Sequence, residues 1–221
     1  MCGRFTQASP AEVIGELFEL PAVPTLAPRY NIAPTQDVAV VRADGGGRQL
    51  AMLHWGLIPS WSKDRAIGAR MINARAETLA DKPAFRSALR NRRCLIVADG
   101  FYEWQKTGTR KQPYHIRMND GRPFAFAGLW ERWAPAGEQP VESCTIVTTA
   151  PNELLAGVHD RMPVILAHHD YPLWLDPAGR EAERVLPLLR AYPAEEMVAY
   201  PVSLRVNDPA NDEPACVAPL P

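Results

Sequence analysis

The N-terminal sequence Met1-Cys2-Gly3-Arg4-Phe5 places a cysteine directly after the initiator methionine. Methionine aminopeptidases remove Met1 when the next side chain is small, and the cysteine side chain meets that requirement. The processed chain would begin with an α-amine and a thiol on adjacent carbons, whose ordinary pKa values are about 8 and about 8.5. Such a 1,2-aminothiol can capture an aldehyde, first as a Schiff base and then as a thiazolidine ring. The alternative is that Cys2 is an ordinary residue at a frayed terminus.

Two further residues could move protons. Glu103 lies in the aromatic sequence Phe101-Tyr102-Glu103-Trp104, just after an apolar run. A carboxyl group packed among rings is desolvated, which raises its pKa and lets it hold or deliver a proton near neutral pH. His159 lies between apolar residues and Asp160, in a turn that precedes an apolar run, and can act as an acid or a base. The alternatives are that Glu103 is the exposed member of an alternating strand and that His159 is structural.

A third group of residues is suited to gripping a sugar–phosphate chain. If Asn73 and Arg75 lie on a strand, their side chains share one face, so an amide for a sugar oxygen would neighbour a guanidinium for a phosphate. Trp61 and Trp104 could stack on unpaired bases, a contact that is worth roughly 1–3 kcal/mol per base. Between Trp61 and Arg93 the chain carries nine basic and three acidic residues. This basic third could hold a phosphate backbone, or it could be a solvated charged face.

Composition limits the remaining possibilities. The chain has 221 residues, a net charge of −1 and 47% hydrophobic residues, which is typical of one folded domain. It contains neither a long apolar run nor a signal peptide, so we expect a cytoplasmic protein that does not bind membranes. The four cysteines form no C-x-x-C pair and have no zinc-like spacing. We therefore expect no metal and no cofactor.

The pattern of apolar residues predicts many short strands and a few helices. The expected helices are one that begins at a capping box on Ser9, and others at 83–91, 151–157 and largely over 176–189, the last with a break near Pro187. The expected strands are 38–42, 49–55, 94–98, 114–118, 124–129, 144–149, 162–166 and 197–202, with a hairpin turn at 44–47, a short strand over 71–74 and a rigid loop at 30–35. These elements indicate an α+β fold, a single domain over residues 1–221 with a curved, mostly antiparallel sheet. The tail from about Asp208 is expected to be loose.

Several ordered blocks of sequence occur together. They are Met1-Cys2-Gly3-Arg4-Phe5, Tyr30-Asn31-Ile32-Ala33-Pro34-Thr35, Trp55-Gly56-Leu57-Ile58-Pro59-Ser60-Trp61, Asn73-Ala74-Arg75-Ala76-Glu77-Thr78, the stretch 93–104, Phe126-Ala127-Gly128-Leu129-Trp130-Glu131, and the stretch 145–166. From residue 2 to about 206 the chain thus resembles the SOS response-associated peptidase (SRAP) family of abasic-site-processing proteins. Position 97, which is commonly proline in the family, is Val97 here.

The resemblance implies a barrel-like bent sheet flanked by helices, and a protein that crosslinks itself to DNA in the damage response. In the family, the residue matched by Cys2 reacts with the ring-opened aldehyde of an abasic sugar to form a thiazolidine. Glu103 matches the carboxylate that assists ring opening, Asn73 the amide that orients the sugar and the cysteine backbone, and His159 a proton-transfer group. The implied DNA-binding residues are Arg4, Trp61, Arg75, Trp104 and Arg161. The implied partner is single-stranded DNA with abasic sites, including single-strand/duplex junctions, bound by a monomer in the cytoplasm and at the nucleoid.

Two other functions stay open at this point. The family name implies a cysteine peptidase, of the hydrolase class, in which Cys2 attacks a peptide carbonyl and removes its own leader; lyase activity is a further expectation. A non-covalent reader of modified DNA would use the tryptophans and arginines alone. Its binding would be reversible, salt-sensitive and indifferent to Cys2.

Overall fold

The computed structural model describes residues 2–43, 45, 47–176 and 178–221. The helices are α1 (Ala11–Phe18), α2 (Arg86–Asn91), α3 (Glu153–Ala156), α4 (Tyr171–Leu175) and α5 (Ala182–Val185). The strands are β1 (Phe5–Gln7), β2 (Arg29–Ile32), β3 (Asp37–Ala43), β4 (Arg48–Trp55), β5 (Asn73–Arg75), β6 (Arg93–Ala98), β7 (Gly100–Thr107), β8 (Arg110–Met118), β9 (Phe124–Trp133), β10 (Val141–Thr149), β11 (Met162–Pro163), β12 (Ile165–Leu166) and β13 (Met197–Pro201). The predicted α+β class with a curved, mostly antiparallel sheet is confirmed.

Five strands close into a barrel. Around the ring, β3 pairs with β4 and β6, β6 pairs with β9, and β9 pairs with β10, all antiparallel. The ring closes where β10 runs parallel to β4. The short strand β5 adds to β10 in parallel outside this ring. The strands predicted at 38–42, 49–55, 94–98, 124–129 and 144–149 all lie in the barrel, and the hairpin turn at 44–47 falls partly outside the described residues.

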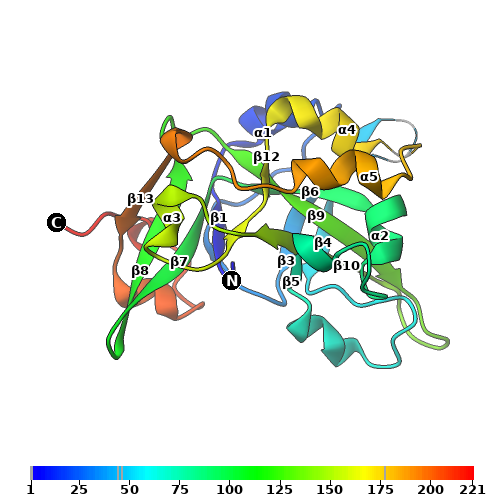
Figure 1. Ribbon diagram of the computed structural model, residues 1–221, viewed down its shortest axis with the longest axis horizontal. Helices are drawn as coiled ribbons and strands as arrows, with labels where there is room; N and C mark the ends of the chain where they lie inside the picture. The colour runs from blue at the N-terminus through cyan, green and yellow to red at the C-terminus, as the bar shows by residue number, and fades with distance from the viewer. Residues whose placement is uncertain (1, 44, 46, 177) are drawn as a thin grey trace.

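A second sheet packs beside the barrel. Its strand order is β13-β8-β7-β1-β2, and each of its pairings is antiparallel. Figure 1 shows β7, β8 and β13 on one side of the molecule, the barrel on the other, and β1 between them. The first strand of the chain therefore lies where the two sheets meet.

The barrel strands β6, β9 and β10 are buried on both faces over most of their length, which explains why they read as apolar runs. One face packs against α1, α2, α4 and α5 through residues such as Leu95 and Val97. Because helices cannot enter a closed five-stranded barrel, this face is the outer one. The alternating residues Cys94 and Ile96 belong to a second core, which also includes Cys2 and Phe5. The N-terminal residues are thus part of the apolar interior.

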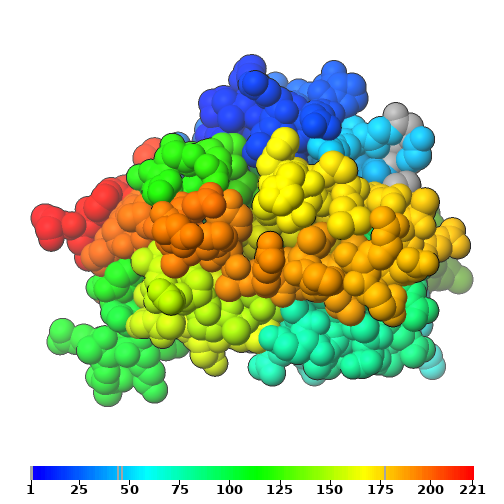
Figure 2. Space-filling model, turned by 45° about the horizontal axis from the view of Figure 1, so that its top comes forward, coloured from blue at the N-terminus to red at the C-terminus, as the bar shows by residue number. Residues whose placement is uncertain are grey.

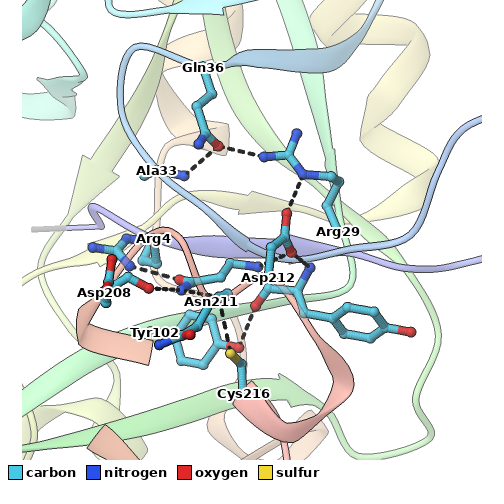
Figure 3. Close-up of polar contacts among 11 residues, drawn as sticks. Arg4, Arg29, Ala33, Gln36, Tyr102, Asp208, Asn211, Asp212 and Cys216 are labelled. Atoms are coloured by element: carbon cyan, nitrogen blue, oxygen red, sulfur yellow. Dashed lines mark hydrogen bonds and ion pairs between the residues drawn. The ribbon is translucent and has the colours of Figure 1, made fainter. Parts of the chain in front are cut away.

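The C-terminal segment 204–217, which we call the clasp, is held by a polar network and is not loose as composition predicted. Asn31 Nδ2 donates hydrogen bonds to three clasp carbonyls, those of Val206, Asp208 and Asn211. Asp212 accepts hydrogen bonds from the backbone amides of Tyr30 and Asn31, and its carboxylate pairs with the guanidinium of Arg29 (Figure 3). The clasp therefore joins β2, and through it β1, to the end of the chain.

Three local predictions were wrong. Ser9 does not cap α1, because its amide and hydroxyl both donate to the Asp99 carboxylate; the cap is Pro10. Residues 30–32 belong to β2 instead of a rigid loop, since β2 pairs with β1. Within 176–189 the described residues form only the short α5 and a 3-10 turn. Figure 2 shows the segment between α5 and β13 as a band that crosses the molecule from the barrel side to the second sheet. Among the described residues, no helix is long and apolar enough to span a membrane.

Candidate active site

Cys2 lies three residues before β1, in the apolar core that includes residues of both sheets. Its side chain is fully buried. Strand β1 is fixed by pairing with β7, where Phe5 opposes Phe101, and by pairing with β2. Burial raises the pKa of the Cys2 thiol, the negative charge of Glu103 raises it further, and a hydrogen bond from the Arg4 amide opposes both effects. The thiol is therefore protonated at neutral pH and needs a base to become a nucleophile.

Asn73 holds the backbone of Cys2. The side-chain amide Nδ2 of Asn73 donates a hydrogen bond of 2.8 Å to the carbonyl oxygen of Cys2. Asn73 is itself fixed because β5 runs beside β10, and because the Trp55 indole donates to the carbonyl of the preceding residue, Ile72. Its Oδ1 is buried and accepts no hydrogen bond from any described residue. The amide therefore has a free acceptor beside the N-terminus, suited to a hydroxyl group of a substrate.

Glu103 is a buried carboxyl group on β7. It is 2% exposed, and burial raises its pKa to about 7. The desolvated carboxyl expected from its aromatic neighbours is confirmed, and the alternative of an exposed strand residue is excluded. Because its pKa is close to neutral, Glu103 can exist as acid or base under the same conditions.

His159 faces Glu103 from the loop after α3. Its Nε2 lies 3.9 Å from Glu103 Oε2. Its Nδ1 accepts a hydrogen bond of 3.0 Å from the backbone amide of Arg161, so the neutral ring carries its proton on Nε2, toward Glu103. Asp160 Oδ1 also lies 2.9 Å from Nδ1, but the Asp160 side chain is 88% exposed and the amide is the fixed partner. Burial lowers the pKa of His159, which favours this neutral form at neutral pH.

The structure thus brings Cys2, Asn73, Glu103 and His159 together from four separate segments of the chain. A hydrogen bond joins Asn73 to Cys2, the charge of Glu103 acts on the Cys2 thiol, and His159 lies next to Glu103. The arrangement combines a thiol, two groups able to exchange protons, and an amide with a spare acceptor. Among the described residues, no group of His, Cys, Asp and Glu is placed to hold a metal ion.

Two of the five predicted DNA-binding residues are openly exposed. The Trp61 side chain is 60% exposed, and its segment is anchored where the Trp133 indole donates to the Ser62 carbonyl. Arg75 is exposed on β5 and shares one strand face with Asn73. Both can reach a ligand in solvent, and their contacts with DNA stay predictions.

The other three predicted DNA-binding residues are engaged with protein groups. Trp104 follows Glu103 on β7, so it points to the opposite face, where its indole donates to Asn207. The Arg4 guanidinium lies 5.8 Å from the centre of the Trp104 ring and donates to Asn31 and the Val206 carbonyl. The clasp thus contacts both residues, which are half-buried.

Arg161 forms a two-pronged ion pair with Glu77, with N–O distances of 2.6 and 2.9 Å. Sequence reasoning missed this partner, although Glu77 belongs to the same sequence block as Asn73. It also missed the clasp contact of Asn31, because no local pattern signals either one.

Comparison with known protein families identifies the family to which the chain belongs. The sequence model of the SOS response associated peptidase (SRAP) family matches residues 1–209. The chain belongs to the SRAP family. The segment that the family model leaves unmatched includes Asp212, one of the clasp residues that bind β2.

Curated SRAP relatives share the name abasic site processing protein. YoqW of Bacillus subtilis is 45% identical over 98% of this chain and 99% of its own length. YedK of Escherichia coli is 31% identical over the full length of both chains. HMCES of Xenopus tropicalis is 32% identical over 87% of this chain, which corresponds to 66% of that protein.

Solved structures share the SRAP fold. A crystal structure of a protein from Bacteroides thetaiotaomicron superposes with a TM-score of 0.86 at 25% identity, over 99% of this chain and 100% of that one. A protein from Bordetella bronchiseptica gives a TM-score of 0.80 at 29% identity, over 92% of this chain and 100% of that one. Membership of the family and the names of the relatives support a role in processing abasic DNA.

Proposed function

We propose that this SRAP protein captures abasic sites in single-stranded DNA by forming a covalent thiazolidine with the processed N-terminal Cys2. The observation that carries the proposal is the position of Cys2, held by Asn73 and placed beside a buried carboxyl group whose pKa is about 7. The relatives named abasic site processing protein supply the substrate class. An abasic sugar offers an aldehyde, and an aminothiol can form two bonds to the aldehyde carbon, one from its nitrogen and one from its sulfur.

The reaction begins with the closed sugar. An abasic deoxyribose is mostly a cyclic hemiacetal, so a base must take the proton of its C1 hydroxyl while an acid protonates the ring oxygen. Glu103 and His159, whose Oε2 and Nε2 atoms lie 3.9 Å apart, would take these two roles. The spare acceptor Oδ1 of Asn73 can take a hydrogen bond from a sugar hydroxyl and orient it toward the amine. Opening yields the aldehyde and changes no other bond.

Capture of the aldehyde then proceeds in two additions. The α-amine adds to the aldehyde carbon, and the resulting carbinolamine loses one water with proton help, leaving an iminium ion. The Cys2 thiol loses its proton to Glu103 as Sγ adds to the same carbon, and the iminium nitrogen becomes an amine. The sum is aldehyde plus aminothiol giving thiazolidine plus one water. Ring closure removes the iminium ion that would promote β-elimination and strand cleavage, so the lesion is shielded.

The DNA strand would approach from the side of Trp61 and Arg75. An exposed tryptophan can stack on a base beside the lesion, and an exposed arginine can bind a flanking phosphate. We expect the protein to act as a monomer in the cytoplasm, at single-stranded regions of the nucleoid and at their junctions with duplex DNA.

The test is covalent capture by the processed protein. Mixing it with single-stranded DNA that contains one abasic site should give a species that survives denaturing electrophoresis, with an intact mass equal to the sum of both components less one water. A Cys2→Ala variant should give a conjugate only when borohydride traps the Schiff base, together with cleaved DNA. If wild type gives no stable conjugate, or if Cys2→Ala gives an equal yield without borohydride, the proposal is wrong.

A variant with an inserted residue between Met1 and Cys2 is the control for the free amine. It keeps the thiol and loses the 1,2-aminothiol, so it should form no conjugate. If the protein is instead a peptidase that removes its own leader, the wild-type chain should lose Met1 even when it is expressed in a host without methionine aminopeptidase. Its intact mass decides between host processing and self-cleavage.

A further inference from the structure

Glu77 holds Arg161 in one orientation. Both carboxylate oxygens of Glu77 accept from the guanidinium of Arg161, and the same guanidinium donates to the backbone carbonyl of Thr148 at 2.7 Å. The Arg161 side chain is only 15% exposed, whereas that of Glu77 is 51% exposed. Two-pronged pairing of this kind fixes both the direction and the distance of an arginine.

The backbone of Arg161 in turn determines how His159 is presented. The Arg161 amide donates to His159 Nδ1 at 3.0 Å, and the two residues are separated only by the exposed Asp160. Because Nδ1 is occupied as an acceptor, the ring proton lies on Nε2, which faces Glu103 at 3.9 Å. Met162, the next residue, is paired with β10, so the backbone of Arg161 is held from one side by β11 and from the other by its own side chain. Release of the guanidinium would loosen the amide that is aimed at the ring.

We infer that Glu77 is a positioning residue for His159, acting through Arg161 to hold the ring in the form that presents its Nε2 proton to Glu103. The inference rests on the proposed function, in which His159 and Glu103 move protons. Glu77 lies two residues after Arg75, so it also places a negative charge beside the expected path of the DNA. The positioning role of Glu77 should favour the crosslinking reaction, whereas its negative charge should weaken DNA binding. Measuring the reaction rate and the DNA affinity separately therefore distinguishes the two effects.

The first measurement compares binding with reaction in Glu77→Gln. Removing a carboxylate from a DNA-binding surface should leave affinity for intact single-stranded DNA unchanged or increase it. Crosslinking to abasic DNA should instead slow by about tenfold or more, since displacing a reacting group by about 1 Å can cost ~10²-fold in rate. A residue that acts only by charge would change binding and rate in the same direction.

The second measurement reports on the His159 ring itself. In wild type, the ¹⁵N shifts of the ring should show one nitrogen protonated, Nε2, and a pKa below the ordinary value because of burial. In Glu77→Gln the loosened ring should gain solvent, so its pKa should rise toward the ordinary value and the two tautomers should mix. Loss of a nearby negative charge alone would lower the pKa.

Glu19→Gln is the matched control. Glu19 pairs with Arg48 at 3.1 Å, with side chains 63% and 13% exposed, which closely resembles Glu77 and Arg161. Glu19 follows α1 as its C-cap and Arg48 begins β4, and no polar contact among the described residues joins either one to a site residue, so the variant should crosslink at the wild-type rate. Because the Glu77 side chain is half exposed, Glu77→Gln should fold as well as this control does, and thermal unfolding checks that it does.

The outcomes separate the inference from the proposed function. If wild type crosslinks and Glu77→Gln has the same rate and the same His159 signals, the positioning role is refuted while the proposed function stands. If wild type does not crosslink, the proposed function is refuted, and the ring shifts of His159 still decide whether Glu77 positions the ring. A slower reaction with undiminished DNA affinity and a raised His159 pKa supports the inference.

Discussion

Glu103→Gln should stabilise the protein above neutral pH while it removes the chemistry. Burial raises the pKa of Glu103 from an ordinary 4.5 to about 7. Between these values the unfolded chain releases the proton and the folded chain keeps it, so folding stability falls as the pH rises through this interval. At ~1.4 kcal/mol for each pH unit, the loss is about 3 kcal/mol. Glutamine has a similar shape and no proton to lose, so the variant avoids this loss.

The assay is urea unfolding of wild type and Glu103→Gln at about pH 5 and about pH 8, which bracket most of the interval. The variant should match wild type at the lower pH and exceed it by up to about 3 kcal/mol at the higher pH. In thermal unfolding this corresponds to a rise of roughly 6–12 °C for a chain of this size. Crosslinking by the variant should be slowed far more than its DNA binding is weakened.

Glu131→Gln is the control at a second buried carboxyl group, on β9. Glu131 is 6% exposed and pairs with Arg92 at 2.8 Å. Its replacement leaves that arginine without its counter-charge, so we expect a loss of stability near neutral pH instead of a gain. If Glu103→Gln is no more stable than wild type at about pH 8, or if its advantage does not grow with pH, the account of Glu103 as a desolvated acid is wrong.

Three further predictions follow from single contacts. Gly100→Ala should lower the unfolding free energy by about 2 kcal/mol or more, because a Cβ there would lie 2.2 Å from His115 Nε2; an unchanged thermal midpoint would contradict this. Asp212→Ala should cost ~2–3 kcal/mol in urea unfolding, since two β2 amides and a guanidinium lose their acceptor, and a wild-type midpoint would show that the clasp is not anchored there. Arg75→Ala should weaken binding to all single-stranded sequences and reduce the salt slope by about 0.7, and an unchanged slope would remove Arg75 from the interface.

The strands of the barrel were predictable from sequence because the signal of each strand is local. Strands such as β6 and β10 are buried on both faces, so each appears as an apolar run whatever its partners are. Strand β2 carries the mixed sequence Arg29–Ile32 and is defined by its pairing with β1, about 25 residues away, which no local pattern reveals. The segment 176–189 has a helical composition. Its described residues form only α5, which ends at Val185, and a 3-10 turn around Pro187, whose ring disfavours a continuous helix.

The site was predictable in part for the same reason. The aromatic neighbours of Glu103 predicted its desolvation, and the position of Cys2 after Met1 predicts an aminothiol whose chemistry stays a proposal. The ion pair between Glu77 and Arg161 joins residues 84 positions apart, and the hydrogen bond between Asn31 and Asn211 joins residues 180 positions apart. Such contacts depend on how the strands are ordered in space, so a single sequence gives no sign of them.

The clasp has a consequence for when the protein becomes competent. Strand β1, which follows Cys2, is anchored by Arg4 and, through β2, by Asn31, and both side chains bind carbonyls in 204–217. A ribosome makes these carbonyls only after the whole barrel has been synthesised, although the domain begins to fold earlier. We therefore expect a nascent chain to carry a processed but poorly supported N-terminus. Competence for capture would then arise only after residues 204–217 have been synthesised and have docked onto the first strands.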